Sequence, residues 1–397
     1  MLRGALQAPQ IEERIMPVSA KSYRDPVDLA CELHERALRC QSQGDQEKAR
    51  ALCRRSLRIL KKSLGPSHPD VANVTDTLAQ TYEATGDLVT AERLCRRSVT
   101  ILEKASRRTR NIVVRKMLAQ CLAQLAEIYS ELGNYKEAEP RFRRALRLAA
   151  RIYPRTAPEL TPFLNNLAVL YKYMGRFPEA KRLYRRGLAI SEKALGPDHP
   201  EVATIYHNLG GLEHARGRFA RGEPFARKSV EIREKALGPD HPSVAADVAA
   251  LAALLESQQK YDEAEKLYRR ALVVFERSYG PHHYEIAVNL NNLASLNYGR
   301  GNHKEAERLY RRALAMKEKL FGSEHPDIAM TLNNLAVLYK SENKLKAAAP
   351  LYLRALTIFE HALGSKHPNT IVCRTNYAEL VGEMKLQARR SRRRPDR

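Results

Sequence analysis

The sequence predicts an all-α solenoid, in which helical hairpins follow one another along a single array. Three observations predict it: a repeat of 42 residues, apolar side chains at helical spacing within each repeat, and glycines where the helices should end. The segments ALGPDHP, which begin at Ala194 and Ala236, show the period most directly. A single hairpin cannot bury its apolar face, whereas stacked copies can, so we expect one continuous array.

The 42-residue period sets the expected boundaries. It places small residues in register at Ala138, Ala180, Gly222, Ala264, Ala306 and Ala348. The eight expected hairpins cover about 25–64, 69–106, 112–153, 158–195, 200–237, 242–279, 284–321 and 326–363. We expect a capping helix over 367–388, a partly disordered leader over 1–24 and a basic, disordered tail over 389–397.

Each copy is predicted to contain two helices. In the eighth copy Leu335, Leu338 and Tyr339 lie on one helical face, and a short break follows. Other copies have a glycine in this break, which suits the left-handed backbone at a helix end. The second helix has small and aromatic residues in alternation, and the next first helix begins at the proline of a His-Pro pair, where proline is tolerated.

Composition bounds the class of protein. The 397 residues are 44% hydrophobic, which excludes global disorder. No apolar run approaches the roughly 18 residues of a membrane span, so we expect no membrane insertion. The start of the sequence has no apolar signal-peptide stretch, and the six cysteines show no metal or redox spacing, so we expect a cytoplasmic protein with reduced cysteines.

The chain is strongly basic. It has 68 Lys and Arg against 45 Asp and Glu, a formal net charge of +23, which favours acidic partners. Arginine pairs recur in the second helices at 54–55, 96–97, 143–144, 185–186, 269–270 and 311–312. Binding of RNA or DNA through these pairs and the basic tail is one hypothesis. The alternative is that the arginines solvate an outer surface and pair with nearby glutamates, and no aromatic residue is interleaved to stack on bases.

The pattern Leu-Ala-x-x-Tyr, a break, then Ala, an aromatic residue and Ala resembles the tetratricopeptide repeat. The segments LNNLAVLY, EAEKLYRRAL and LGPDHP are similar to the 42-residue form found in kinesin light chains. The resemblance implies a right-handed superhelix whose first helices line a concave groove. It also implies a non-enzymatic scaffold or adaptor that binds a segment of a partner protein.

Polar pairs in the first helices are the candidate binding residues. The resemblance implies that the second asparagine of such a pair binds the backbone of an extended peptide, and a carboxamide can both donate and accept. Lys172 and Lys340 lie seven residues beyond Asn165 and Asn333, on the same side of the helix, and would steer the carboxylates of an acidic peptide. The predicted concave-groove set is Asn165, Asn166, Lys172, His207, Asn208, Asn291, Asn292, Tyr298, Asn333, Asn334 and Lys340. The alternative is that the asparagines only bond neighbouring helices and hold the stack together.

Other chemistry finds no support in the sequence. There is no phosphate-binding glycine loop, no nucleophile elbow and no metal-ligand spacing, so we expect no catalytic residue, no cofactor and no metal. A series of histidines precedes prolines at His68, His199, His241, His325 and His367, with His283 in the same place. Successive loops of a solenoid lie too far apart to share one ion, so we attribute this series to turn geometry. The sequence does not indicate an oligomeric state.

Overall fold

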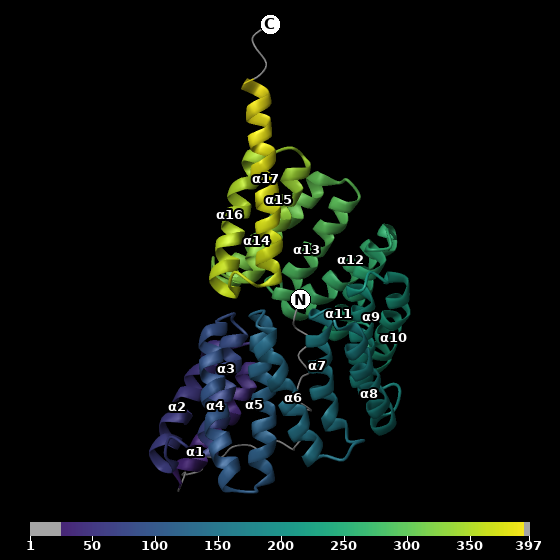
Figure 1. The fold of residues 1–397 in the computed structure, drawn as a ribbon. Coiled ribbons are helices and arrows are strands. Elements are labelled where there is room, and N and C mark those ends of the chain that lie inside the picture. Colours follow the sequence, from purple (N-terminus) through teal and green to yellow (C-terminus); the bar gives the residue numbers. More distant parts are fainter. Residues whose placement is uncertain (1–24, 393–397) are drawn as a thin grey trace. The chain divides into compact units, whose positions relative to one another are not determined.

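The computed structural model describes residues 25–392, and the leader 1–24 and residues 393–397 of the tail lie outside the described residues. Within 25–392 there are helices and turns but no strand, so the predicted all-α class is confirmed (Figure 1). The chain divides into two compact units, Met1–Leu170 and Tyr171–Arg397. Each unit is a stack of helical hairpins.

The first unit contains three complete hairpins and most of a further helix. Its helices are α1 (Pro26–Ser42), α2 (Gln46–Leu64), α3 (Pro69–Glu83), α4 (Leu88–Arg108), α5 (Ile112–Glu131) and α6 (Tyr135–Ile152). A 3-10 turn, η1 (Pro158–Leu160), leads into α7 (Thr161–Tyr173), and the boundary between the units falls inside α7.

The second unit contains the remaining hairpins and a terminal helix. Its helices are α8 (Phe177–Leu195), α9 (Pro200–Ala215), α10 (Phe219–Leu237), α11 (Pro242–Glu256), α12 (Tyr261–Tyr279), α13 (Tyr284–Gly299), α14 (His303–Phe321), α15 (Pro326–Ser341), α16 (Leu345–Leu363) and α17 (Pro368–Arg392). The terminal helix α17 continues past residue 388, the expected end of the cap, to Arg392.

The His-Pro loops form helix caps. In His241, for example, Nδ1 accepts a hydrogen bond from the backbone N–H of Ser243 at 3.1 Å, and proline occupies the first turn of α11. The same cap occurs at His68, His199, His283, His325 and His367. The loops therefore follow turn geometry, because each imidazole satisfies a backbone donor that the helix leaves free. The preceding glycines, such as Gly196 with φ +90°, adopt backbone angles that side-chain-bearing residues rarely reach.

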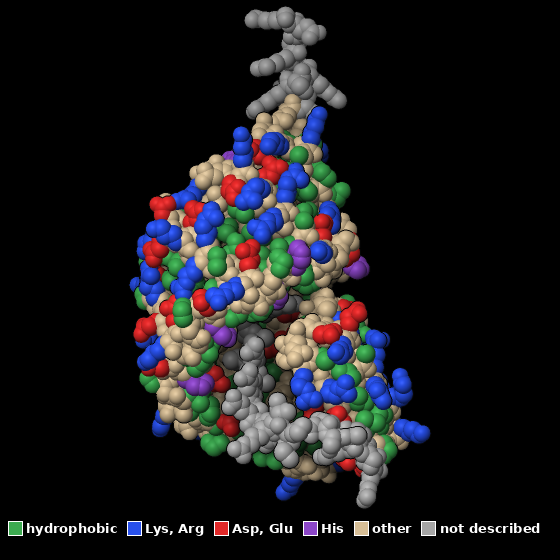
Figure 2. Space-filling view, turned by 180° about the vertical axis from the view of Figure 1, so that it is seen from behind, with side chains coloured by type: hydrophobic (Ala, Val, Ile, Leu, Met, Phe, Trp, Pro, Cys, Tyr) green, Lys and Arg blue, Asp and Glu red, His purple; other side chains and the backbone are tan. Residues whose placement is uncertain are grey.

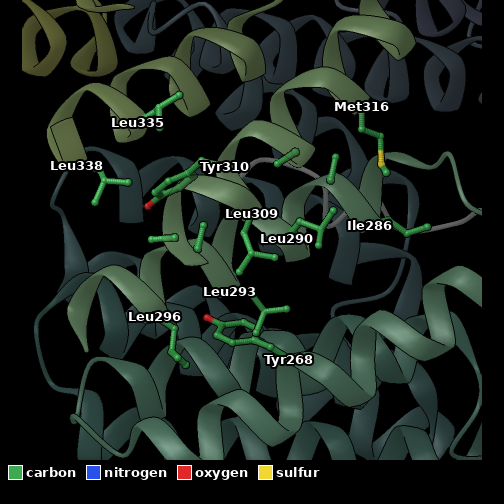
Figure 3. Packing of buried hydrophobic residues seen from close by; sticks show 14 of the residues in the cluster. Tyr268, Ile286, Leu290, Leu293, Leu296, Leu309, Tyr310, Met316, Leu335 and Leu338 are labelled. Carbon is green, nitrogen blue, oxygen red and sulfur yellow. The ribbon is translucent and has the colours of Figure 1, made fainter. Parts of the chain in front are cut away.

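Small and aromatic residues alternate in the core as predicted. Tyr268, Tyr310 and Tyr352 are at most 3% exposed, and Figure 3 shows Tyr268 and Tyr310 among leucines of the neighbouring helices. In the first unit Cys53 and Cys95 occupy the same position in the repeat and are fully buried, so they act there as small hydrophobic residues.

Gly222 replaces the usual packing alanine at the contact between α9 and α10. A Cβ atom added to Gly222 would lie 2.8 Å from Leu254 Cδ2 and 3.0 Å from the backbone oxygen of Gly210. The two helices therefore approach so closely at Gly210 and Gly222 that no side chain fits between them. The glycine keeps the hairpin compact.

The first helices of successive hairpins lie next to one another. Helix α3 contacts α1 and α5 in the first unit, and α11 contacts α9 and α13 in the second, whereas α4 and α12 pack chiefly against first helices. Within each unit the odd-numbered helices therefore form one continuous surface, which we call the first-helix face. This face carries the predicted binding residues.

Candidate functional site

Side-chain hydrogen bonds join neighbouring first helices along the first-helix face. In the first unit Gln41 donates to Gln80 (3.1 Å), Gln80 donates to Gln124 (3.3 Å), and Gln124 donates to Glu83 (3.1 Å). Each bond joins residues of different first helices. Some polar side chains of this face therefore hold the stack together, which is the role that the alternative interpretation of the sequence gives to the asparagines.

The predicted pair Asn165 and Asn166 takes part in this bonding. Asn165 is 4% exposed and donates to Oδ1 of Asn166 at 3.3 Å. The Nδ2 of Asn166 donates in turn to the carboxylate of Glu127 on α5. Burial, together with the nearby carboxylate of Glu131, raises the pKa of Glu127 to about 7, although the bond from Asn166 opposes this rise. The Asn166 carboxamide is therefore engaged within the protein.

His207 and Asn208 are also tied into the stack. His207 Nδ1 lies 2.8 Å from Oδ1 of Asp247, a carboxylate that is 3% exposed, and Asn208 is 9% exposed. Asp247 accepts further hydrogen bonds from Ser229 Oγ and from Arg233 Nε, both at 2.6 Å. Burial alone would raise the pKa of Asp247, but the His207 and Arg233 contacts outweigh burial and lower it. This network joins α9, α10 and α11.

In the asparagine pairs of α13 and α15, only the first asparagine is buried or bonded to a neighbouring helix. Asn291 is 9% exposed, and Asn333 accepts a hydrogen bond from Asn376 of α17 at 3.2 Å. Asn292 and Asn334 are partly exposed, and neither side chain makes a hydrogen bond to the part of the chain that the structure describes. These two carboxamides are free to bind a ligand.

Tyr298 lies near the end of α13, on the same first-helix face. Its ring stacks on His303 with the ring centroids 5.8 Å apart. At the same place in the preceding repeat Glu256 accepts hydrogen bonds from Tyr268 and Ser295, both at 2.9 Å. This position therefore holds a tyrosine in one repeat and a glutamate in the one before it, and it holds a lysine at Lys172 and Lys340.

The two predicted lysines have different surroundings. Lys340 Nζ lies 3.0 Å from Glu379 and 3.2 Å from Glu383, both on α17. Lys172 makes no ion pair with any described residue, and its Nζ lies 4.9 Å from the centroid of the Tyr173 ring. Burial lowers the pKa of Lys172 to about 8. Of these two lysines, Lys172 is therefore the one without an acid partner in the described part of the chain.

The partners of the predicted residues were not foreseen from the sequence. Glu127, Asp247 and Glu379 each engage a predicted residue; Glu127 and Asp247 lie on the first helices of adjacent hairpins, and Glu379 lies on the terminal helix α17. The signal that could have identified them is a separation of 39 or 40 residues, slightly less than one repeat. Two polar residues at that separation lie on adjacent helices of the first-helix face, where their side chains can reach each other.

Most of the recurring arginine pairs contact acids. Arg269 lies 2.7 Å from Glu265, Arg311 lies 2.9 Å from Glu307, and Arg270 pairs with Glu234. In Figure 2 the Lys and Arg side chains on the visible face are interspersed with Asp and Glu. This mixture fits the interpretation that the arginines solvate the surface and pair with glutamates.

Metal sites and membrane spans are absent from residues 25–392. No cluster of three or more His, Cys, Asp or Glu residues in this range is arranged to hold a metal ion. None of the helices described there is long and apolar enough to cross a membrane.

The sequence matches two family models described as tetratricopeptide repeat. One matches residues 28–104, 160–235, 201–247 and 245–319, and the other matches 118–156 and 328–369. Together the matches extend over most of the array of hairpins. A comparison with curated proteins found no significant match.

Solved structures of helical repeat proteins are similar to this chain. BtubC (BKLC) from P. vanneervenii is 27% identical, with a TM-score of 0.45, and the match covers 60% of this chain and 93% of that one. A kinesin light chain-type repeat protein from Podosopora anserina is 24% identical (TM-score 0.42, coverage 51% and 97%). A Rap protein complexed with competence and sporulation factor is 11% identical, with a TM-score of 0.54 and coverage of 91% and 99%. The Rap likeness shows a shared fold.

Proposed function

Because the chain belongs to the tetratricopeptide repeat family, we propose that it is a non-enzymatic scaffold or adaptor that binds an extended segment of a partner protein along its first-helix face. The observation that carries this proposal is the free state of Asn292 and Asn334. Each carboxamide offers one acceptor and two donors, so it can satisfy a peptide unit whatever the side chain of that residue. Their positions in successive repeats suit one continuous peptide.

The partner segment is proposed to be acidic. Support comes from the net charge of +23 and from Lys172, whose ammonium group has no acid partner among the described residues. Lys340 contributes less than the sequence predicts, because two carboxylates of α17 already compensate its charge. Selection for acidic residues should therefore centre on Lys172, and affinity should fall as salt rises.

The other predicted residues take supporting roles in this proposal. Asn165, Asn166, His207, Asn208, Asn291 and Asn333 shape the first-helix face and hold its helices in register, and Tyr298 adds an aromatic contact. We place the protein in the cytoplasm, because Cys53, Cys95, Cys121 and Cys373 are buried free thiols that need no oxidising compartment.

The experiment is a partner screen with the purified chain, followed by fluorescence titration of overlapping, Trp-tagged peptides from any partner captured. The protein contains no Trp, so the peptide signal is free of background. The double variant Asn292→Ala/Asn334→Ala should lose about 30-fold in peptide affinity, since each lost hydrogen bond is worth about 1 kcal/mol. Its melting temperature should stay near that of the parent.

The matched control is Asn73→Ala, which removes an exposed asparagine of α3 with no side-chain hydrogen bond among the described residues. Its affinity should be unchanged. Unchanged affinity in the double variant, or a large fall in its melting temperature, would refute this mode of binding. Retention on RNA or DNA that Arg185→Glu/Arg186→Glu abolishes would instead favour the nucleic-acid alternative.

A further inference from the structure

The connection between α4 and α5 concentrates positive charge next to exposed aliphatic side chains. Residues 104–116 include six Lys or Arg and no Asp or Glu. All seven residues from 107 to 113 are exposed, and Ile112 and Val113 are 53% and 56% exposed. Most of the other hairpin junctions are short loops that end in a histidine cap, and the α4–α5 junction has no such cap.

The segment after α6 adds to the same region. Lys116 Nζ lies 5.0 Å from the ring centroid of Tyr153, which places the first turns of α5 against the end of α6. Arg151 in the last turn of α6 is exposed as well. We call Arg107, Arg108, Arg110, Ile112, Val113 and Arg151 the loop-edge patch.

The arginines of the loop-edge patch have no acid partner in the described part of the chain. At corresponding edges of the second unit, by contrast, Lys235 lies 2.5 Å from Asp198 and Arg277 lies 3.3 Å from Asp240. Arg110 also precedes the N-terminus of α5, where the helix dipole disfavours a cation. The helix dipoles favour Arg107, Arg108 and Arg151, which lie in the last turns of α4 and α6, but no acid of the described chain pairs with them.

The combination of arginines and exposed aliphatic side chains in the patch favours an anionic bilayer over a nucleic acid as its ligand. Ile112 and Val113 are adjacent, aliphatic and directed to solvent, and residues 107–113 offer no aromatic ring for stacking on bases. A nucleic-acid backbone would pair with the arginines but leave both aliphatic side chains in water. An anionic bilayer meets both needs, because its headgroups attract the cations and its acyl boundary accepts short apolar side chains.

We propose that the loop-edge patch adsorbs to the surface of membranes rich in anionic lipid, with Ile112 and Val113 inserted at the headgroup boundary. This adsorption goes beyond the proposed peptide binding and uses a different set of residues. It is peripheral, in keeping with the finding that no described helix can span a membrane.

The test is co-sedimentation of the full chain with vesicles of phosphatidylcholine that contain about one third phosphatidylserine, and with vesicles of phosphatidylcholine alone. We expect binding to the anionic vesicles only, weakened by salt. Arg107→Ser/Arg108→Ser/Arg110→Ser should bind about 100-fold more weakly, since each cation near the surface contributes about 1 kcal/mol. Ile112→Ser/Val113→Ser, which keeps every charge, should bind about tenfold more weakly.

The matched control is Arg182→Ser/Arg185→Ser/Arg186→Ser, which removes the same charge from exposed positions of α8. It should keep most of the vesicle affinity. Equal losses in both triple variants, no preference for anionic vesicles, or normal binding by Ile112→Ser/Val113→Ser would each overturn the proposal. The proposal would also be overturned, in favour of a nucleic-acid site, if the chain bound a DNA or RNA duplex more tightly than the anionic vesicles and Ile112→Ser/Val113→Ser left that duplex affinity unchanged. Peptide affinity should be unchanged in all these variants, so this test is independent of the proposed function.

Discussion

The ammonium nitrogen of Lys340 lies 3.0 Å from Oε2 of Glu379, so the last lysine of the predicted groove is bound to the terminal helix α17. A second carboxylate, that of Glu383, lies 3.2 Å from the same nitrogen. Burial would lower the pKa of Lys340, but the two carboxylates outweigh burial and raise it. Lys340 therefore helps to dock α17 and is left with little charge for a ligand.

The first prediction separates the two lysines. Lys340→Met should change affinity for an acidic peptide less than about threefold and lower stability by less than about 1 kcal/mol, because both of its carboxylate partners are about half exposed to solvent. Lys172→Met should weaken the same peptide about tenfold, since it removes the uncompensated cation. Fluorescence titration and urea unfolding measure both effects. If Lys340→Met weakened binding of the acidic peptide more than Lys172→Met did, Lys172 would not be the residue that selects acidic partners.

The second prediction concerns Asn166. Asn166→Ala should destabilise the first unit by about 1–3 kcal/mol, because the partly buried Glu127 carboxylate loses its donor. Hydrogen exchange of α5 and α7 should rise. Asn334→Ala is the matched control, since its carboxamide has no hydrogen bond within the described chain, and its exchange rates should not change. Equal effects of the two substitutions would show that Asn166 is not structural.

The third prediction tests the close approach of α9 and α10. Gly222→Ala should destabilise the protein by about 1–3 kcal/mol, because the added methyl group would lie 3.0 Å from the backbone oxygen of Gly210 in α9 and 2.8 Å from Leu254 Cδ2 in α11. Gly382→Ala in α17 is the control, since a Cβ there meets nothing within 4 Å and alanine favours the helix by about 0.5–1 kcal/mol. Thermal melting should rank the parent between the two variants.

The fourth prediction concerns the histidine caps. His241→Ala should lower stability by about 0.5–2 kcal/mol, because α11 loses the acceptor for the Ser243 N–H. His241→Ser should keep most of the stability, since serine is a good N-cap residue. Thermal melting of both variants measures the difference. If His241→Ser were as unstable as His241→Ala, the histidine would have a role other than capping.

The fifth prediction is a pH dependence at Asp76. This carboxyl is 8% exposed, burial raises its pKa to about 6, and hydrogen bonds from the thiols of Cys95 and Cys121 only partly oppose the rise. The folded state therefore holds this proton to a higher pH than the unfolded chain, whose pKa is about 3.9, and the Asp76 contribution to stability falls as pH rises between those values.

Asp76→Asn should remove this pH dependence of stability, because asparagine does not ionise. The melting temperature of Asp76→Asn, relative to the parent, should be higher at about pH 8 than at about pH 4.5. Asp247→Asn should show the opposite trend, because the folded-state pKa of Asp247 is lowered and its contribution is lost as pH falls. A relative melting temperature of Asp76→Asn that is independent of pH would contradict a raised pKa of the buried Asp76 carboxyl.

Prediction of the candidate site from the sequence was partial. The helical spacing correctly placed Asn166, Asn292 and Lys340 on first helices, because a period of 3.6 residues fixes which side chains share a face. It could not distinguish the engaged Asn166 from the free Asn292. That difference depends on whether the adjacent first helix supplies an acceptor such as Glu127, and no local pattern encodes this.

The sequence by itself determined the secondary structure and the order of the hairpins. Local rules suffice for both: a repeated apolar period selects helices, and glycine, histidine and proline start and stop them at most junctions. Even where Asn343 replaces the usual glycine, the backbone keeps φ +59°, because asparagine tolerates that conformation.

The tertiary structure alone decided which polar groups remain available to a partner. It paired Lys340 with Glu379, tied Asn166 to Glu127 and left the arginines at 107, 108 and 110 without acid partners in the described chain. Hydrogen bonds and ion pairs form only between groups that folding brings within a few ångströms of each other. Residues about 40 positions apart become neighbours only when the hairpins stack.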